Sequence, residues 1–275
     1  MQVLQRTTQH IKDVETLQIS NEAPSTAGSS PVLMSNELIA DDISNKVSPP
    51  STSVLSKVFQ FIQSWSTQMQ ALGAAAFLVA VPVFIQAPLV RLFPAFSLLL
   101  TAAWLFLGWR LLRKPSMQLW GDLLIGFSWT WLAGAIYWGW FRWDPYVHLP
   151  IEAVGLPMVL ILMRYGKAKI GNYFYVGSLL GTAITDLYFY CVGLIPYWKQ
   201  LMMRPPSEAG SILHSALLRM ETYQGVGCAI VLLTLLIMLG TVPLRSPDAK
   251  WWAFSGAVLS TILVDSLFFV AAVLA

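Results

Sequence analysis

Four acidic side chains lie in or beside long apolar runs of this sequence, where they could donate and accept protons. They are Asp122, Glu152, Asp186 and Asp265. A charge at the centre of a bilayer costs at least about 2.5–3.5 kcal/mol, so each acid needs a physical reason for its place. Asp122 falls in the first turn of an expected helix, where the helix dipole and nearby water favour a carboxylate. We therefore interpret Asp122 as structural.

Asp186 and Asp265 have matching surroundings. Each follows a Thr by four residues and a pair of small residues spaced four apart: Gly177, Gly181 and Thr182 before Asp186, and Gly256, Ser260 and Thr261 before Asp265. Small residues at this spacing let two helices approach closely, and a Thr can donate a hydrogen bond to a residue four positions later. We predict that the two helices pack together with both carboxylates turned inward, as a hydrogen-bond clamp or as a substrate or proton site.

Glu152 enters its apolar run from the opposite direction, within the segment 148–152. An acid in the first turn after a proline is favourable for the helix dipole, which is its simplest explanation. Its depth nevertheless approaches that of Asp186 and Asp265, which lie about 20 Å from their inner helix ends at 1.5 Å per residue. We hypothesise that the three acids converge and are the candidate catalytic residues. The nearest candidate counter-charges by topology are Arg142, His148 and Lys199.

Aromatic side chains gather at the same outer level. They are Tyr137, Trp138, Trp140, Trp143, Tyr146, Tyr188, Tyr190, Tyr197 and Trp198. Amphipathic rings are favoured at membrane interfaces, so an interfacial belt is one interpretation. A cavity for a flat or long apolar ligand, such as an isoprenoid or a pigment, is the other.

No known cofactor or metal motif accompanies these residues. The sequence holds no phosphate-binding loop, no His-Glu-x-x-His and no Gly-x-Ser-x-Gly, and its three histidines lie far apart. Two cysteines, Cys191 and Cys228, are too few for a disulfide scaffold or a zinc site. Both fall near outer helix ends, where they could form one disulfide or serve as small apolar fillers. We expect no cofactor and no metal.

The composition is that of a membrane protein. Apolar residues make up 56% of the 275 residues and charged residues only 11%, against about 25% charged in soluble domains. Runs long enough to cross a bilayer as helices span 71–90, 94–112, 119–141, 147–163, 171–195, 225–242 and 251–274. We predict an all-α, polytopic membrane bundle of about seven helices over residues 71–275. Proline pairs interrupt the first run (Pro82, Pro88) and the fourth (Pro150, Pro157).

The segment before the bundle differs in composition. Residues 1–53 are rich in Ser, Thr, Asn, Asp, Glu and Pro, which cannot bury enough apolar area to fold, and we predict a disordered cytoplasmic tail. Residues 54–70 show apolar positions three and four apart with polar residues between them, which predicts an amphipathic helix in the membrane interface. The longest connection between spans, 196–224, carries a short apolar stripe and would be a surface lid or a tethered loop.

Basic residues in the connections predict the orientation. With the tail inside, nine fall on the inner side and five on the outer side. The inner ones are Lys57, Arg110, Arg113, Lys114, Arg164, Lys167, Lys169, Arg245 and Lys250, and the outer ones are Arg91, Arg142, Lys199, Arg204 and Arg219. The N-terminus is therefore expected in the cytoplasm. The net charge of +3 is small and scattered, so we expect no nucleic-acid partner.

Several segments resemble an uncharacterised family of cyanobacterial integral membrane proteins, the domain of unknown function 3120 family. They are Gln86–Arg91, Trp120–Asp122, Tyr137–Trp140, Leu149–Pro157, Gly171–Tyr175 and Trp251–Gly256. The resemblance covers about residue 71 to the C-terminus and implies a cyanobacterial thylakoid or plasma membrane. Leu149–Glu152 is also similar to the Pro-x-Glu-Glu motif of small membrane lycopene cyclases, but Ala153 replaces the second acid.

Three functions stay open from the sequence. The first is an accessory or assembly factor of photosynthetic membrane complexes, which the resemblance implies. The second is a lipid-phase enzyme or a binder for an isoprenoid or pigment, with Glu152, Asp186 and Asp265 exchanging protons with the ligand. The third is a small proton-coupled transporter that uses the same acids as a relay. We place the assembly role narrowly first.

Overall fold

The computed structural model describes residues 66–274, and all the regular structure in that range is helical. Six helical segments are long and apolar enough to cross a bilayer: Thr67–Leu92, Pro94–Leu112, Pro115–Phe141, Pro145–Arg164, Tyr223–Arg245 and Ala249–Leu274. A seventh combines α8 (Lys169–Val192) and α9 (Ile195–Met203), which meet at a bend of 102°. The predicted all-α membrane bundle is confirmed. The predicted tail 1–53 and most of the predicted interfacial helix 54–70 lie outside the described residues.

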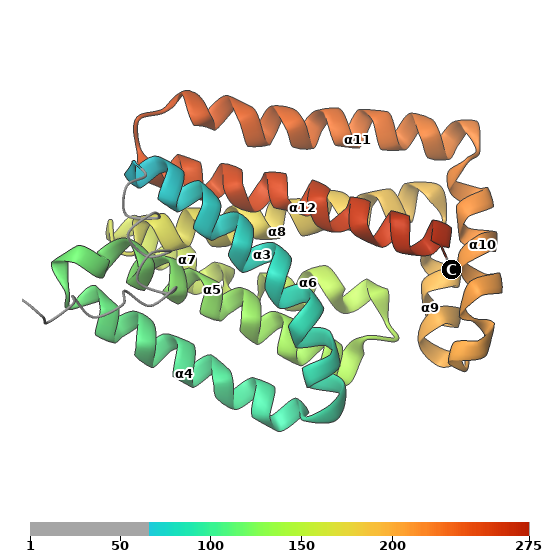
Figure 1. Ribbon diagram of the computed structural model, residues 1–275, viewed down its shortest axis with the longest axis horizontal. Coiled ribbons are helices and arrows are strands. Elements are labelled where there is room, and N and C mark those ends of the chain that lie inside the picture. The colour runs from blue at the N-terminus through green and yellow to red at the C-terminus, as the bar shows by residue number, and fades with distance from the viewer. Residues whose placement is uncertain (1–65, 275) are drawn as a thin grey trace, which may run out of the picture. The chain divides into compact units, whose positions relative to one another are not determined.

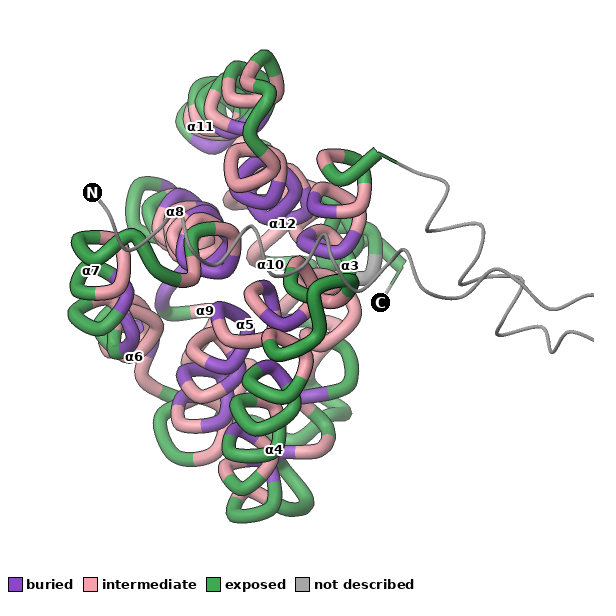
Figure 2. Tube along the Cα trace, turned by 90° about the vertical axis from the view of Figure 1, so that its left-hand side faces the viewer, coloured by how far each residue is buried: buried purple, intermediate pink, exposed green. Residues whose placement is uncertain are grey.

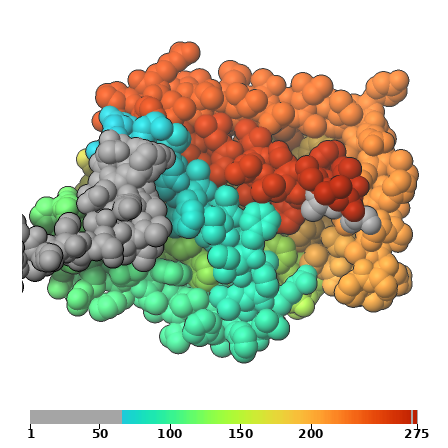
Figure 3. All heavy atoms as spheres, viewed as in Figure 1, coloured from blue at the N-terminus to red at the C-terminus, as the bar shows by residue number. Residues whose placement is uncertain are grey.

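The last helix lies at the centre of the bundle (Figure 1). α12 (Ala249–Leu274) packs against α3 (Thr67–Leu92) and against α8. α5 (Gln118–Ile136) packs on α8 and on α4 (Pro94–Leu112), while α11 (Tyr223–Thr241) covers α12 and α8. Figure 3 shows α3, α12 and α11 side by side on one face.

Buried residues form narrow inward stripes on these helices (Figure 2). α4 and α11 are exposed over most of their apolar surface. Exposed apolar surface on this scale would be unfavourable in water but is favourable against acyl chains. The backbone amide and carbonyl groups, which lipid cannot satisfy, form their hydrogen bonds within the helices. The arrangement therefore fits a lipid bilayer as the surrounding solvent.

Glycines let the central helices touch backbone to backbone. A Cβ atom built on Gly126 of α5 would collide with the backbone of Gly171 on α8, and one on Gly177 would lie 2.6 Å from the carbonyl oxygen of Phe254. Gly256, on another side of α12, faces the carbonyl oxygen of Leu72 on α3. Larger residues here would force the helices apart.

The two proline pairs have different effects. α3 continues through Pro82 and Pro88 as one helix, and it begins at Thr67, so the last residues of the predicted interfacial helix belong to the first span. The fourth span is broken: η3 (Pro145–Val147) and α6 (His148–Glu152) are followed by the 3₁₀ turn η4 (Ala153–Gly155) and by α7 (Leu156–Arg164). Pro157 cannot donate an amide hydrogen into the preceding turn, which is consistent with a break at this point.

The connection predicted as a lid or loop consists of helices. α9 and α10 (Ala209–Met220) lie across one end of the bundle, which we call the cap end (Figure 1). α8 ends at Val192, and the next residue, Gly193, has a φ of 76°, which is typical of the left-handed residue that follows a helix. Arg219 of α10 donates to the Val192 carbonyl at 2.8 Å and so ties α10 to the end of α8.

Candidate functional site

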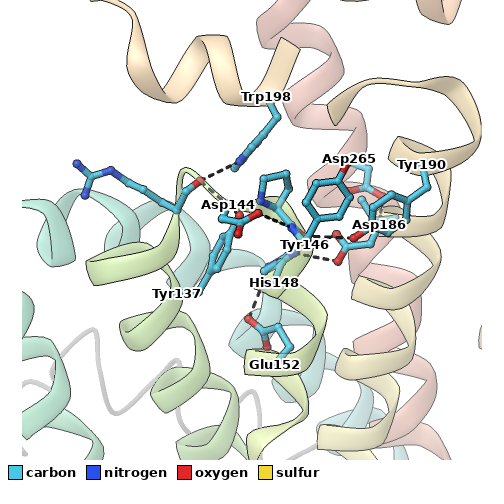
Figure 4. A network of polar contacts seen from close by, with 12 residues as sticks. Tyr137, Asp144, Tyr146, His148, Glu152, Asp186, Tyr190, Trp198 and Asp265 are labelled. Atoms are coloured by element: carbon cyan, nitrogen blue, oxygen red, sulfur yellow. Dashed lines mark hydrogen bonds and ion pairs between the residues drawn. The ribbon is translucent and has the colours of Figure 1, made fainter. Parts of the chain in front are cut away.

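The fourth span places a histidine between two acids (Figure 4). His148 Nδ1 lies 2.9 Å and 3.1 Å from the two carboxylate oxygens of Asp186 on α8. Its other ring nitrogen, Nε2, lies 3.9 Å from a carboxylate oxygen of Glu152. The three side chains are only 22%, 14% and 13% exposed in the order His148, Asp186 and Glu152. Imidazole thus links two carboxylates within the bundle.

The break in the span determines where Glu152 lies. Glu152 is the last residue of α6, immediately before η4. Its carbonyl oxygen accepts a hydrogen bond of 2.7 Å from the hydroxyl of Tyr175, a fully buried residue of α8. On the opposite side of the break, Gly155 packs so closely on Trp129 that an added Cβ would lie 2.8 Å from the Trp129 Cβ. Neighbours on α8 and α5 therefore hold the break.

Asp265 reaches the same region from α12. One of its carboxylate oxygens accepts a hydrogen bond of 2.8 Å from Thr185 of α8, the residue before Asp186. Figure 4 shows the Asp265 carboxylate beyond that of Asp186, on the side away from Glu152. The structure therefore brings all three predicted acids into one cluster, with His148 joining two of them and Thr185 joining the third to α8.

The hydrogen bonds of the predicted Thr-Asp motif differ from those expected. Thr261 donates to the carbonyl of Ala257 in its own helix at 3.2 Å, and Ser260 also donates to Ala257, at 2.9 Å. Within the described range, Thr182 donates to no carboxylate. The expected bonds within each helix are therefore wrong, because Thr185 bonds Asp265 across the helix interface and His148 bonds Asp186.

The small residues of the motif lie at two different interfaces. Gly177 contacts Phe254, and Gly181 contacts the side chain of Thr261, so both face α12. Gly256 faces α3 instead. Sequence reasoning missed Thr185, although it continues the spacing of four that begins with Gly177 and Gly181 and therefore lies on the same helix face.

Of the three candidate counter-charges, only His148 contacts an acid of the cluster. Arg142 donates to the Trp138 carbonyl at 3.3 Å, and Lys199 lies over the ring of Tyr146, 4.8 Å from its centroid. Among the described residues, His148 is thus the one group able to carry a positive charge that contacts these carboxylates. The cluster therefore has three acidic groups and one basic group.

Aromatic rings surround the cluster on the cap side. Tyr137 is buried in a π-helical turn, η2 (Tyr137–Phe141), and its ring lies 4.2 Å from that of His148. Tyr146 stacks on Tyr190 at 6.0 Å. Trp198 of α9 donates to the Arg142 carbonyl at 2.9 Å and packs against Trp138. Aromatic packing thus connects the cap to the cluster, and π-helical turns often occur at functional sites.

Asp122 lies apart from the cluster and supports the start of α8. Its carboxylate accepts a hydrogen bond of 2.9 Å from the backbone amide of Ile170, in the first turn of α8. Ala168, the residue at the helix start, supplies no capping side chain. Asp122 therefore caps α8 rather than its own helix. It also lines two pockets of about 460 and 610 Å³ at the end opposite the cap.

The remaining candidate ligands are isolated. Cys191 and Cys228 are both free thiols. No group of three or more His, Cys, Asp or Glu side chains within residues 66–274 is arranged to hold a metal ion.

Comparison with known proteins identifies one family. A family model described as "Protein of unknown function (DUF3120)" matches residues 75–273, which include every member of the cluster. No curated protein and no solved structure matches the chain.

Proposed function

The chain belongs to the DUF3120 family, whose function is unknown, and from that premise we propose that it is a small proton-coupled membrane transporter. Its proton site is His148 with Glu152 and Asp186. The observation that carries the proposal is the contact of each imidazole nitrogen with a different carboxylate, at 2.9 Å and 3.9 Å, beside a broken membrane helix.

The geometry supports proton transfer through the imidazole. A neutral imidazole that accepts a proton at Nε2 from Glu152 becomes an imidazolium, and it can then release the Nδ1 proton to Asp186. One proton has then moved from Glu152 to Asp186, and the imidazole has changed tautomer. The 3.9 Å separation of Nε2 and Glu152 exceeds a hydrogen-bond distance, so this step requires a side-chain movement or a bridging water.

The broken span favours transport over a purely structural role. Transporters commonly place coupling-ion sites at discontinuous helices, because the interrupted backbone and its side chains can change position there. A clamp between helices would be served equally well by an uninterrupted helix with one interhelical hydrogen bond. The fourth span instead breaks immediately after the residue that carries the second carboxylate.

The setting of the protein is part of the proposal. We place it in the thylakoid or plasma membrane of a cyanobacterium, with the N-terminus in the cytoplasm, because of the resemblance and the distribution of basic residues. An accessory or assembly role in photosynthetic membranes requires no proton movement, and neither does binding of a pigment or isoprenoid. Proton flux therefore separates these alternatives from transport.

The test uses purified protein in phosphatidylcholine–phosphatidylglycerol liposomes that contain the pH dye pyranine. A potassium diffusion potential drives protons across the membrane. The proton flux is measured without added solute and then, separately, with NaCl, CaCl₂ or mixed amino acids outside the liposomes. The proton flux of the wild type should exceed that of protein-free liposomes in at least one condition. Asp186→Asn should reduce the flux about 100-fold, since a positioned acid–base group contributes about 10²–10⁴-fold to a rate.

The matched control is Asp248→Asn, which removes a carboxylate at the other end of the bundle, 3.0 Å from Lys250. It should behave as the wild type. A wild type that never exceeds protein-free liposomes, or an Asp186→Asn variant that keeps its flux, would contradict the transporter proposal.

A further inference from the structure

We infer that Tyr175 is a positioning residue of the proton site, which holds the break in the fourth span and thereby sets the distance between Glu152 and His148. The inference rests on the proposed function. The Tyr175 hydroxyl donates to the backbone carbonyl of Glu152. Tyr175 therefore acts on the site through the backbone of Glu152 and not by a direct hydrogen bond to His148 or Asp186.

The break changes the hydrogen-bond partners of the Glu152 carbonyl. In a continuous α-helix the amide of Leu156 would donate to the carbonyl of Glu152. Here the Leu156 amide donates to the Ala153 carbonyl instead. In the 3₁₀ turn that follows, the Glu152 carbonyl instead accepts from the amide of Gly155, three residues later. A carbonyl oxygen can accept two hydrogen bonds, and the Tyr175 hydroxyl, at 2.7 Å, supplies a second one from α8 that favours the broken conformation.

Tyr175 is rigidly placed to do this. Its side chain is fully buried on α8. It precedes Asp186 by 11 residues on the same helix, which is close to three turns, so the two residues lie on the same helix face. One helix therefore holds both carboxylates of the relay: Asp186 by direct attachment, and Glu152 through the hydrogen bond to its carbonyl.

The opposite side of the break allows little compensation. Gly155 lies against Trp129 of α5 without room for a methyl group. Loss of the Tyr175 hydroxyl would remove the hydrogen bond that ties the Glu152 carbonyl to α8, which would let the Glu152 side chain move relative to His148. Proton transfer depends steeply on such distances, and a misplacement of about 1 Å can cost about 10²-fold in rate.

The experiment compares Tyr175→Phe with Tyr173→Phe, a control on the same helix whose ring packs on Trp251 of α12. Tyr175→Phe should reduce the pyranine-detected proton flux about 10- to 100-fold, while Tyr173→Phe should not change it. In a Glu152→Gln background, Tyr175→Phe should add no further loss, because the hydroxyl acts only through Glu152. An independent, additive loss would overturn the inference.

A second measurement does not depend on transport. The ring ¹⁵N resonances of His148, assigned by their loss in His148→Gln, should shift in Tyr175→Phe and stay in place in Tyr173→Phe. If the wild type conducts no protons, the transporter proposal is wrong. If the His148 resonances are unchanged in Tyr175→Phe, the positioning role of Tyr175 is wrong, whatever the proton flux. Should Tyr175→Phe not fold, 3-fluorotyrosine at position 175 keeps the hydroxyl and must move the same resonances.

Discussion

At the scale of single residues, the cluster is held by contacts from three different helices. α6 contributes His148 and Glu152, α8 contributes Asp186 and Thr185, and α12 contributes Asp265. Polar groups in a bilayer core are costly unless they find partners. The contacts between helices therefore both stabilise the bundle and place the acids near one imidazole, so structural and chemical roles overlap at this site.

The bond between Thr185 and Asp265 allows a stability prediction at this scale. Thr185→Val removes the hydroxyl donor but keeps the shape of the side chain. We expect the free energy of unfolding to fall by about 0.6–1.7 kcal/mol, between the average and the largest value measured for hydrogen bonds between membrane helices. Unfolding by SDS titration in mixed micelles would measure it.

Thr234→Val is the control, because the Thr234 hydroxyl donates to a carbonyl of its own helix, Ile230, on an exposed face. It should change the free energy of unfolding by no more than about 0.5 kcal/mol. Equal losses in the two variants would mean that the Thr185 bond contributes no specific stability.

The sequence was sufficient to select the three acids and to place His148 among three candidate counter-charges, but not to single out His148 or to find Thr185. Asp186 and Asp265 stand out because each is an ionisable residue deep in an apolar run. Their actual partners, His148 and Thr185, depend on how three helices are rotated about their axes, and hydropathy does not specify that rotation. Thr185 could have been found from its place four residues after Gly181, whereas Tyr175 carries no such signal.

At the scale of elements, the crossing of α5 and α8 depends on the absence of side chains. Gly126→Ala would place a methyl group against the backbone of Gly171, where neither helix can yield locally. We expect a loss of about 1–3 kcal/mol in the free energy of unfolding, as for other overpacked interiors. The same SDS titration would measure it.

Gly227→Ala is the matched control, since a Cβ atom at Gly227 would meet nothing within 4 Å. Alanine is about 1 kcal/mol more favourable than glycine within a helix, so this variant should be neutral or slightly stabilising. If Gly126→Ala were equally neutral, the close approach of α5 and α8 would not be needed for stability.

Element boundaries were easier to predict than element breaks. The second span, Pro94–Leu112, has the predicted limits, because apolar residues and a proline at the first position mark it clearly. The presence of two prolines did not by itself predict a helix break. α3 continues through Pro82 and Pro88, while the fourth span breaks between Pro150 and Pro157. At the break the Glu152 carbonyl has a tertiary partner, the Tyr175 hydroxyl, which the sequence does not reveal.

At the scale of the whole molecule, the predicted orientation can be checked with a native thiol. Cys191 is exposed at the end of α8, which is outside if the N-terminus is cytoplasmic. In a Cys228→Ser background, a membrane-impermeant maleimide should label Cys191 in intact cells that express the protein in their plasma membrane. Labelling only after the membrane is opened would reverse the assigned orientation.

The central position of α12 has a consequence for how the protein is made. Helices enter the membrane in the order of synthesis, so α3 and α8 are inserted before the helix that separates them exists. Until α12 has been inserted, Leu72 and Gly177 lack the neighbours they contact in the finished bundle. A nascent chain stopped before residue 249 would therefore expose these surfaces to membrane proteases.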